Sequence, residues 1–332
     1  MAKVIIGIHG LANKPPKHLL QKWWKKAIVE GLTDRGNPRY RFKFVMVYWA
    51  DLIYENPLDP EVKNKEDELY IEEPYISSAN MPVENEKSKL GEIFDGIIKE
   101  VVLSDTISIK LTTVFDKLLE KFFNELHIYF SHLAETRKNK TIDVQKEARE
   151  RLKNVIEKYK DHEILLIAHS MGTIITYDVL THCLNGCFID TLVTIGSPLG
   201  IPYIVHKLHG EKEIELSESK MKTPDNICTH WFNFADADDL VGMNINLSDY
   251  YTENDFSISA DSKLVYNDYS VNGNKNPHKS YGYLRTPEVA DIVYEFLTRD
   301  ENKFTRYVKN SANKTFDIFV NRIAKKFKKK NK

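Results

Sequence analysis

The sequence contains few cysteines, no excess of charge of either sign and no long apolar run. Its three cysteines, Cys183, Cys187 and Cys228, are too few for a disulfide framework and lack the spacing of a metal site. Lys and Arg number 47 and Asp and Glu 48, so the net charge of -1 gives no reason to expect nucleic acid as a partner. No apolar stretch is long enough to span a bilayer or to act as a secretory signal. Together with the low cysteine count, these absences favour a cytoplasmic protein.

The most informative stretch is ILLIAHSMG, at residues 164–172. A short apolar run with polar boundaries is typical of a strand that is buried on both faces of a parallel sheet. Residues 173–180 can form a helix, so Ser170 is predicted at the apex between a strand and a helix. That arrangement matches the nucleophile-elbow pattern G-x-S-x-G, with Ala168 in the first glycine position. An ordinary helix start, with Ser170 as its N-cap, is the alternative.

This stretch resembles the serine elbow of the α/β-hydrolase superfamily, in its lipase and esterase branch. Members of that superfamily carry an oxyanion-hole loop before the serine, and an acid and then a histidine after it. The resemblance extends over residues 3–49 and 140–299. It implies an α/β fold of the α/β-hydrolase type, with a mostly parallel sheet flanked by helices.

A His-Gly pair follows the first predicted strand, Lys3–Ile8. Ligands of open α/β sheets bind beyond the carboxyl ends of the strands, where this pair lies. Glycine allows the backbone to approach a substrate closely, although an ordinary turn between a strand and a helix also favours it. The resemblance implies that the backbone N–H groups of Leu11 and Met171 form the oxyanion hole.

Residues 51–139 depart from a minimal fold of this type. They follow a predicted helix, Pro15–Leu32, and a predicted strand, Arg41–Trp49, and contain no clear parallel strand. The part up to about residue 88 is polar and is predicted to be loop. Beyond it, apolar side chains recur every three or four residues and predict amphipathic helices: Phe94, Ile97, Ile98, Val101, Val102, Leu111, Val114, Phe115, Leu118, Phe122, Leu126, Tyr129 and Leu133. In the resembling hydrolases such an insertion caps the serine. A helical pair that only enlarges the core and a stripe that contacts a membrane are the alternatives.

The segments before and after the predicted elbow also fit a parallel α/β sheet. The helix Asp143–Tyr159 leads into the elbow strand, as in the crossover unit of a parallel sheet. The next predicted strand, Ile189–Ile195, ends in GSPLG at residues 196–200, a turn that lipase-like hydrolases commonly carry at this point. Ser197 in that turn precedes a proline and lacks the strand–apex–helix setting, so we interpret it as structural.

Three aspartates compete for the role of the triad acid. Asp236, Asp238 and Asp239 follow the predicted strand Ile227–Phe234, but they do not complete the ligand spacing of a cation site. In the resembling hydrolases the acid is often followed two residues later by an aliphatic residue, which favours Asp239. Asp236 is the alternative, and Asp238 is predicted to face solvent. His278 lies in a loop before a predicted helix and has the position that the triad base requires.

The chain is predicted to form a single domain, residues 1–332, with the insertion at about 51–139 and a basic tail at about 302–332. Most basic tails are solvated, and a minority bind anionic lipid or nucleic acid. The insertion and the tail are therefore the two candidates for a peripheral membrane contact.

The chemistry implied by the resemblance is hydrolysis of an ester or thioester, from a small molecule or a lipid, through an acyl-enzyme. Ser170 would be the nucleophile, His278 the base and Asp239 the acid that orients it. No metal or organic cofactor is required. Acyl transfer on the same triad, and a non-catalytic binding or membrane-associated protein that has kept the fold, are the alternatives.

Overall fold

The computed structural model describes residues 1–37, 41–78, 124–131, 134–135, 141–209, 220–242 and 246–301. At its centre is a six-stranded sheet with the order β10-β8-β6-β5-β1-β2. Every neighbouring pair in this sheet is parallel. The strands are β1 (Lys3–Ile8), β2 (Lys43–Val47), β5 (Glu163–His169), β6 (Ile189–Ile195), β8 (Ile227–Asp236) and β10 (Ala260–Val265). The predicted parallel sheet is therefore confirmed.

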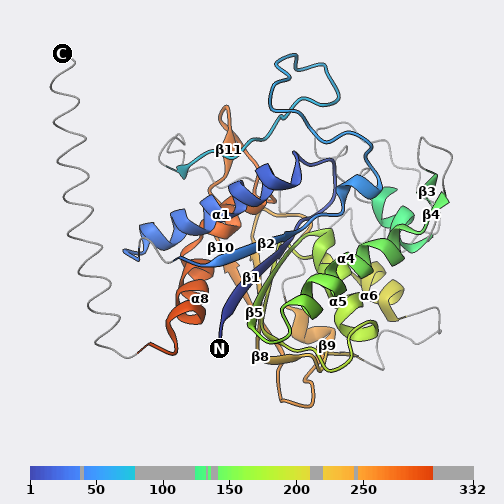
Figure 1. Ribbon diagram of the computed structural model, residues 1–332, viewed down its shortest axis with the longest axis vertical. Helices are drawn as coiled ribbons and strands as arrows, with labels where there is room; N and C mark the ends of the chain where they lie inside the picture. The colour runs from blue at the N-terminus through green and yellow to red at the C-terminus, as the bar shows by residue number, and fades with distance from the viewer. Residues whose placement is uncertain are drawn as a thin grey trace.

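Helices cover both faces of the sheet, as Figure 1 shows: α1 and α8 lie on one face, and α4 and α5 on the other. The helices are α1 (Lys17–Asp34), α4 (Val144–Lys158), α5 (Met171–His182), α6 (Pro202–His209), α7 (Ser280–Arg285) and α8 (Pro287–Thr298). A hydrophobic core lies on each face, and the side chains of β5, which is buried from Ile164 onward, alternate between the two. The architecture is α/β. Helices α6 and α7 were not predicted.

Short elements complete the described part of the chain. The 3-10 helices are η1 (Ala50–Leu52), η3 (Pro198–Gly200) and η4 (Leu247–Asp249). The two-residue strands form three small ladders: β3 (Ala134–Glu135) with β4 (Thr141–Ile142), β7 (Met221–Lys222) with β9 (Tyr251–Thr252), and β11 (Ser270–Val271) with β12 (Asn274–Lys275).

The predicted helix boundaries are close to those observed, and side-chain caps mark the starts of α4 and α8. Asp143 is the N-cap of α4, and its carboxylate accepts a hydrogen bond from the N–H of Lys146 at 3.0 Å. Thr286 caps α8 in the same way, with a proline at the first helical position.

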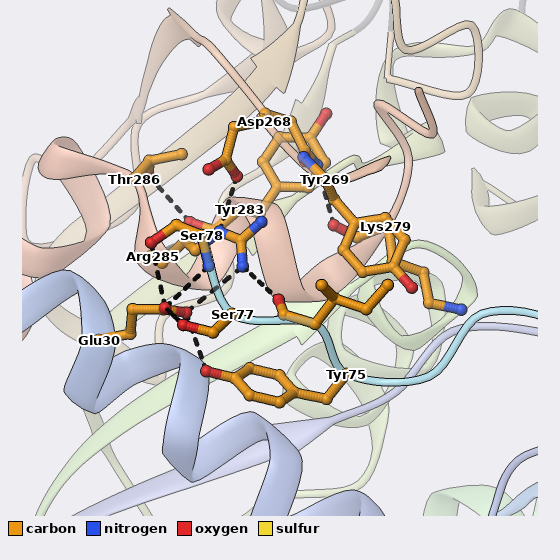
Figure 2. Close-up of polar contacts among 12 residues, drawn as sticks. Glu30, Tyr75, Ser77, Ser78, Asp268, Tyr269, Lys279, Tyr283, Arg285 and Thr286 are labelled. Carbon is orange, nitrogen blue, oxygen red and sulfur yellow. Dashed lines mark hydrogen bonds and ion pairs between the residues drawn. The ribbon is translucent and has the colours of Figure 1, made fainter. Parts of the chain in front are cut away.

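The first part of the insertion is anchored to the body of the protein. Figure 1 traces residues 51–78 across the top of the view toward β11. Figure 2 shows how Tyr75, Ser77 and Ser78 converge on the Glu30 carboxylate, which lies beside Arg285. Burial raises the pKa of Glu30, but the hydrogen bonds from Ser77, Tyr75 and Ser78 outweigh it and lower the pKa overall. The polar composition of this segment correctly predicted that residues 53–77 contain no α-helix, but it did not predict this attachment.

The second part of the insertion is described only in part. Residues 124–130 are helical, and Leu126 and Tyr129 lie in the core. Tyr129 donates a hydrogen bond to Asp178 of α5 at 2.6 Å. The other apolar positions predicted to form the helical stripe, Phe94 to Phe122 and Leu133, lie outside the described residues, as does the basic tail 302–332. In the described ranges no helix combines the length and the apolar character that a bilayer crossing demands.

Candidate active site

Ser170 occupies a strained turn between β5 and α5. Its φ of 52° and ψ of -128° lie in a region that residues other than glycine rarely adopt, at a cost of roughly 1–3 kcal/mol. Gly172 allows α5 to approach the end of β1, because a Cβ there would lie 2.8 Å from the carbonyl oxygens of Ile8 and His9. The Ser170 side chain makes no capping hydrogen bond to α5. Ser170 is therefore the N-cap residue of α5 by position, but it does not cap the helix through its side chain.

His278 joins the serine to an aspartate. Its Nε2 lies 2.9 Å from Ser170 Oγ, and its Nδ1 lies 2.9 Å from each carboxylate oxygen of Asp239. Asp239 is fully buried, whereas the His278 side chain is 12% exposed. In this geometry Nδ1–H donates to the carboxylate, so that Nε2 is free to accept the proton of the serine hydroxyl. The structure thus brings together the three residues that the sequence predicts for the triad.

The Asp239 carboxylate is held by three further donors. Oδ1 accepts from the N–H groups of Val241 at 3.0 Å and Gly242 at 3.3 Å, and Oδ2 accepts from the Tyr283 hydroxyl at 2.6 Å. Tyr283 is buried, and its hydroxyl in turn accepts from the N–H of Asp236 at 2.8 Å. Burial, and then the charge of Asp239, raise the pKa of Tyr283 well above its ordinary value, so it remains a donor. No sequence pattern pointed to Tyr283.

The two other aspartates have partners other than His278. Asp236 is buried and accepts from the N–H groups of Asp238 at 2.8 Å and Asn267 at 2.6 Å. Burial raises the pKa of Asp236. Asp238 forms an ion pair with Lys275 at 2.9 Å and keeps 20% of its side chain exposed, so the expectation that it faces solvent is met only in part. Asp236 therefore stabilises the end of β8, and Asp239 is the aspartate that contacts His278.

The GSPLG turn lies directly against the Asp239–His278 pair. Gly196 has a φ of +52°, and a Cβ at this position would be 2.8 Å from Asp239 Oδ2 and 3.1 Å from His278 Nδ1. Ser197 is buried and donates a hydrogen bond to the Thr173 hydroxyl at 3.0 Å, while its own oxygen accepts from the N–H of Leu199. These contacts agree with a structural role for Ser197.

The loop after β1 lies against the serine. A Cβ on Gly10 would come within 2.6 Å of the Ser170 Cβ, so only glycine fits. His9 Nε2 accepts from the N–H of Trp49 at 3.0 Å, which leaves the proton on Nδ1, and Nδ1 donates to the Gly10 carbonyl at 2.7 Å. Because C=O and N–H point in opposite directions across a trans peptide, this bond directs the N–H of Leu11 away from His9. Burial, and then Lys14, lower the pKa of His9 well below its ordinary value, so the ring stays neutral.

Leu11 and Met171, the predicted oxyanion-hole donors, lie on two segments that meet at Ser170. Leu11 follows Gly10, and Met171 follows Ser170 as the first residue of α5. The N–H of Met171 therefore belongs to the first turn of α5, where N–H groups have no partner within the helix. The contact between Gly10 and Ser170 places these two segments side by side.

His169 supports the loop that carries His278. Its Nε2–H donates to the His278 carbonyl at 2.7 Å, and the centroids of the two rings are 4.8 Å apart. Burial lowers the pKa of His169 well below its ordinary value, and the neighbouring His278, Lys14 and Lys279 lower it further. The side chain is therefore a neutral donor.

We expect His169 to make the protein less stable in mild acid. A histidine that stays neutral when folded contributes fully above its ordinary pKa of 6.5, and this contribution is lost as the pH falls, because only the unfolded chain takes up the proton. The loss is roughly 1.4 kcal/mol per pH unit below that pKa. Replacing His169→Gln keeps a side-chain N–H donor and should flatten the dependence of the unfolding free energy on pH by about one proton. Urea unfolding between about pH 5 and 8 measures this slope.

His182 supplies a control of opposite sign. The hydrogen bond to Asp178 raises the pKa of His182, so His182 contributes stability that is present in acid and is lost as the pH rises. Its side chain is 52% exposed, which makes the effect small. His182→Gln should therefore steepen the loss in acid slightly. Equal slopes for wild type and His169→Gln would contradict the prediction.

The described ranges contain no group of three or more His, Cys, Asp or Glu residues that could hold a metal ion. Comparison with known proteins found no family model that matches the chain and no curated protein that matches it.

Proposed function

We propose that the protein is a serine hydrolase of the α/β-hydrolase type, which cleaves a carboxylic ester or thioester through an acyl-enzyme. The observation that carries this proposal is the hydrogen-bonded series Ser170–His278–Asp239. Its strongest support is that the serine also occupies a strained strand-to-helix apex, which a helix cap does not require.

The order of the strands supports the same assignment. Strand β5 lies between β1 and β6, so the Ser170 apex, the Gly10 loop and the Gly196 turn meet at one edge of the sheet. The acid follows β8, and the histidine follows β10. Serine, acid and histidine therefore occur in the chain order of α/β-hydrolases.

In the first half of the proposed reaction, Ser170 Oγ attacks the carbonyl carbon of the ester while its proton passes to His278 Nε2. The N–H groups of Leu11 and Met171 donate to the oxyanion of the tetrahedral intermediate. The imidazolium then gives its proton to the leaving alcohol or thiol as the C–O or C–S bond breaks. Ser170 is left acylated.

In the second half, a water molecule gives its proton to His278 and attacks the acyl carbon. The proton returns to Ser170 Oγ as the acid product leaves. Asp239 stabilises the imidazolium in both halves without becoming protonated itself. Its bonds to Tyr283, Val241 and Gly242 keep the carboxylate oriented toward Nδ1.

The first test is hydrolysis of short p-nitrophenyl esters. We expect steady release of p-nitrophenol, preceded by a burst that approaches one equivalent of enzyme if deacylation is slow. Acyl transfer, the runner-up, predicts that an added alcohol or amine diverts the acyl group to itself in preference to water. A non-catalytic membrane protein predicts salt-sensitive binding to anionic liposomes and no turnover, which would refute the proposal.

A further inference from the structure

The loop that carries Leu11 continues into a strained residue. Ala12 has a φ of +70°, in the left-handed region that costs a residue with a Cβ about 1–2 kcal/mol. A backbone in this conformation persists only where surrounding contacts hold it. Ala12 directly follows the proposed oxyanion donor, so whatever holds Ala12 fixes the peptide on the other side of Leu11 and, together with the His9 bond to Gly10, constrains where the N–H of Leu11 points.

Glu125, in the insertion, holds this residue. Its Oε1 accepts from the N–H of Ala12 at 2.7 Å, and the same oxygen accepts from the Tyr54 hydroxyl at 2.7 Å. Glu125 is only 4% exposed, so both bonds form away from bulk water. Burial, and then the charge of Glu125, raise the pKa of Tyr54, which therefore remains a phenol donor.

The other side of the same peptide group is also bound. The Lys14 ammonium donates to the carbonyl oxygen of Leu11, and it donates to that of Ala12 at 3.1 Å. The peptide between Leu11 and Ala12 is thus held at its oxygen by a cation and at its nitrogen by a carboxylate. His9 binds the carbonyl of the preceding peptide. Of these three side chains only Glu125 comes from outside the loop, across 113 residues.

We propose that Glu125 is a positioning residue for the oxyanion hole: its bond to Ala12 keeps the loop in the strained conformation that presents the N–H of Leu11 to the reacting carbonyl. This inference rests on the proposed serine-hydrolase function. It gives the insertion a part in catalysis, because Tyr54 lies near its beginning and Glu125 near its end, and both meet at the loop. No residue of the insertion then has to touch the substrate.

Three substitutions of Glu125 separate the elements of this role. Glu125→Met keeps the length of the side chain and removes the acceptor. Glu125→Gln keeps an acceptor oxygen in the same place and removes the charge. Glu125→Asp keeps the charge but is one methylene shorter and does not reach Ala12.

We expect Glu125→Met to lower kcat for a p-nitrophenyl ester by about ten- to a hundredfold, with KM changed less than about threefold, because the missing interaction acts on the transition state. Binding of a trifluoromethyl ketone, which forms an oxyanion on the serine, should weaken by about the same factor. Glu125→Gln should stay within about threefold of wild type, and Glu125→Asp should fall by about tenfold.

The controls distinguish this role from a merely structural one. Thermal unfolding checks that each variant is folded, and Glu125→Asp supplies the test if Glu125→Met is not. A folded Glu125→Met or Glu125→Asp with wild-type kcat and ketone affinity, while Ser170→Ala is inactive, would overturn the role of Glu125 alone. A loss that appears in KM and not in ketone binding would do the same. A wild-type protein without esterase activity would overturn the proposed function and this role together.

Discussion

Ser170→Ala is expected to eliminate both ester turnover and reaction with a fluorophosphonate probe. The hydroxyl is the atom that His278 Nε2 contacts at 2.9 Å, and alanine retains nothing that can attack a carbonyl or phosphorus centre. Removing the nucleophile of a serine triad lowers kcat by about a million-fold. Mass spectrometry of the labelled wild-type protein should place the adduct on the peptide that contains Ser170. Steady-state assays with p-nitrophenyl esters measure the loss of turnover.

Ser197→Ala is the matched control for this prediction. Ser197 is also buried and follows a strand in the same sheet, but its hydroxyl donates to Thr173 at 3.0 Å. We expect this variant to label at the wild-type rate, apart from a modest loss of stability of about 1 kcal/mol from the missing hydrogen bond. An adduct on Ser197, or on no serine at all, would refute the assignment of Ser170.

Asp239→Asn is expected to lower kcat by about ten-thousandfold while the protein remains folded. The backbone N–H groups of Val241 and Gly242 both donate to Oδ1. The asparagine oxygen is therefore expected at that position, and its NH₂ group at the position of Oδ2, where it faces His278. A donor there favours the tautomer in which Nδ1 accepts and the imidazole proton is on Nε2. The base can then no longer accept the proton of Ser170.

Turnover of Asp236→Asn and Asp238→Asn provides the comparison. Asp236 accepts two backbone N–H groups, so its replacement should destabilise the protein by about 1–3 kcal/mol and change kcat less than about tenfold. Asp238 is partly exposed and pairs with Lys275, so Asp238→Asn should change both the stability and kcat only slightly. If Asp236→Asn lost activity while Asp239→Asn kept it, the acid would be three residues earlier than proposed. Unfolding by urea, run on all three variants, separates lost chemistry from lost structure.

Local patterns were sufficient for the elements that carry the site. The strand Ile189–Ile195 was predicted with its observed boundaries, and the elbow was recognised because a strand buried on both faces must be apolar throughout. The small residues at the apex were informative for a steric reason. Gly172 packs closely against the carbonyl oxygens of β1 and of the loop that follows it, and Gly10 packs closely against Ser170, so neither position has room for a Cβ. Because only glycine fits such close contacts, these steric constraints can be read from the sequence.

Helices α6 and α7 were missed because both are short, with 8 and 6 residues, and neither offers a long periodic pattern. Tyr283 was missed for a related reason. A tyrosine in an apolar helix is ordinarily a core residue, and its hydroxyl becomes significant only because α7 passes the loop after β8. The sequence shows that residue 283 is a tyrosine, but it does not show which carboxylate the Tyr283 hydroxyl contacts.

The sequence by itself determined the parallel strands, the strained serine apex and the order of candidate residues, because steric limits and burial act on each short segment separately. The sequence favoured Asp239 over Asp236 only through the family resemblance, and the contact of Asp239 with His278 is seen only in the tertiary structure. The contact of Glu125 with Ala12 had no signal in the sequence. These contacts join residues 39 and 113 positions apart. They depend on the order in which the strands pair and on the paths of the loops between them. Neighbouring carboxylates differ little in local sequence, and their hydrogen-bond partners are assigned only when the chain folds.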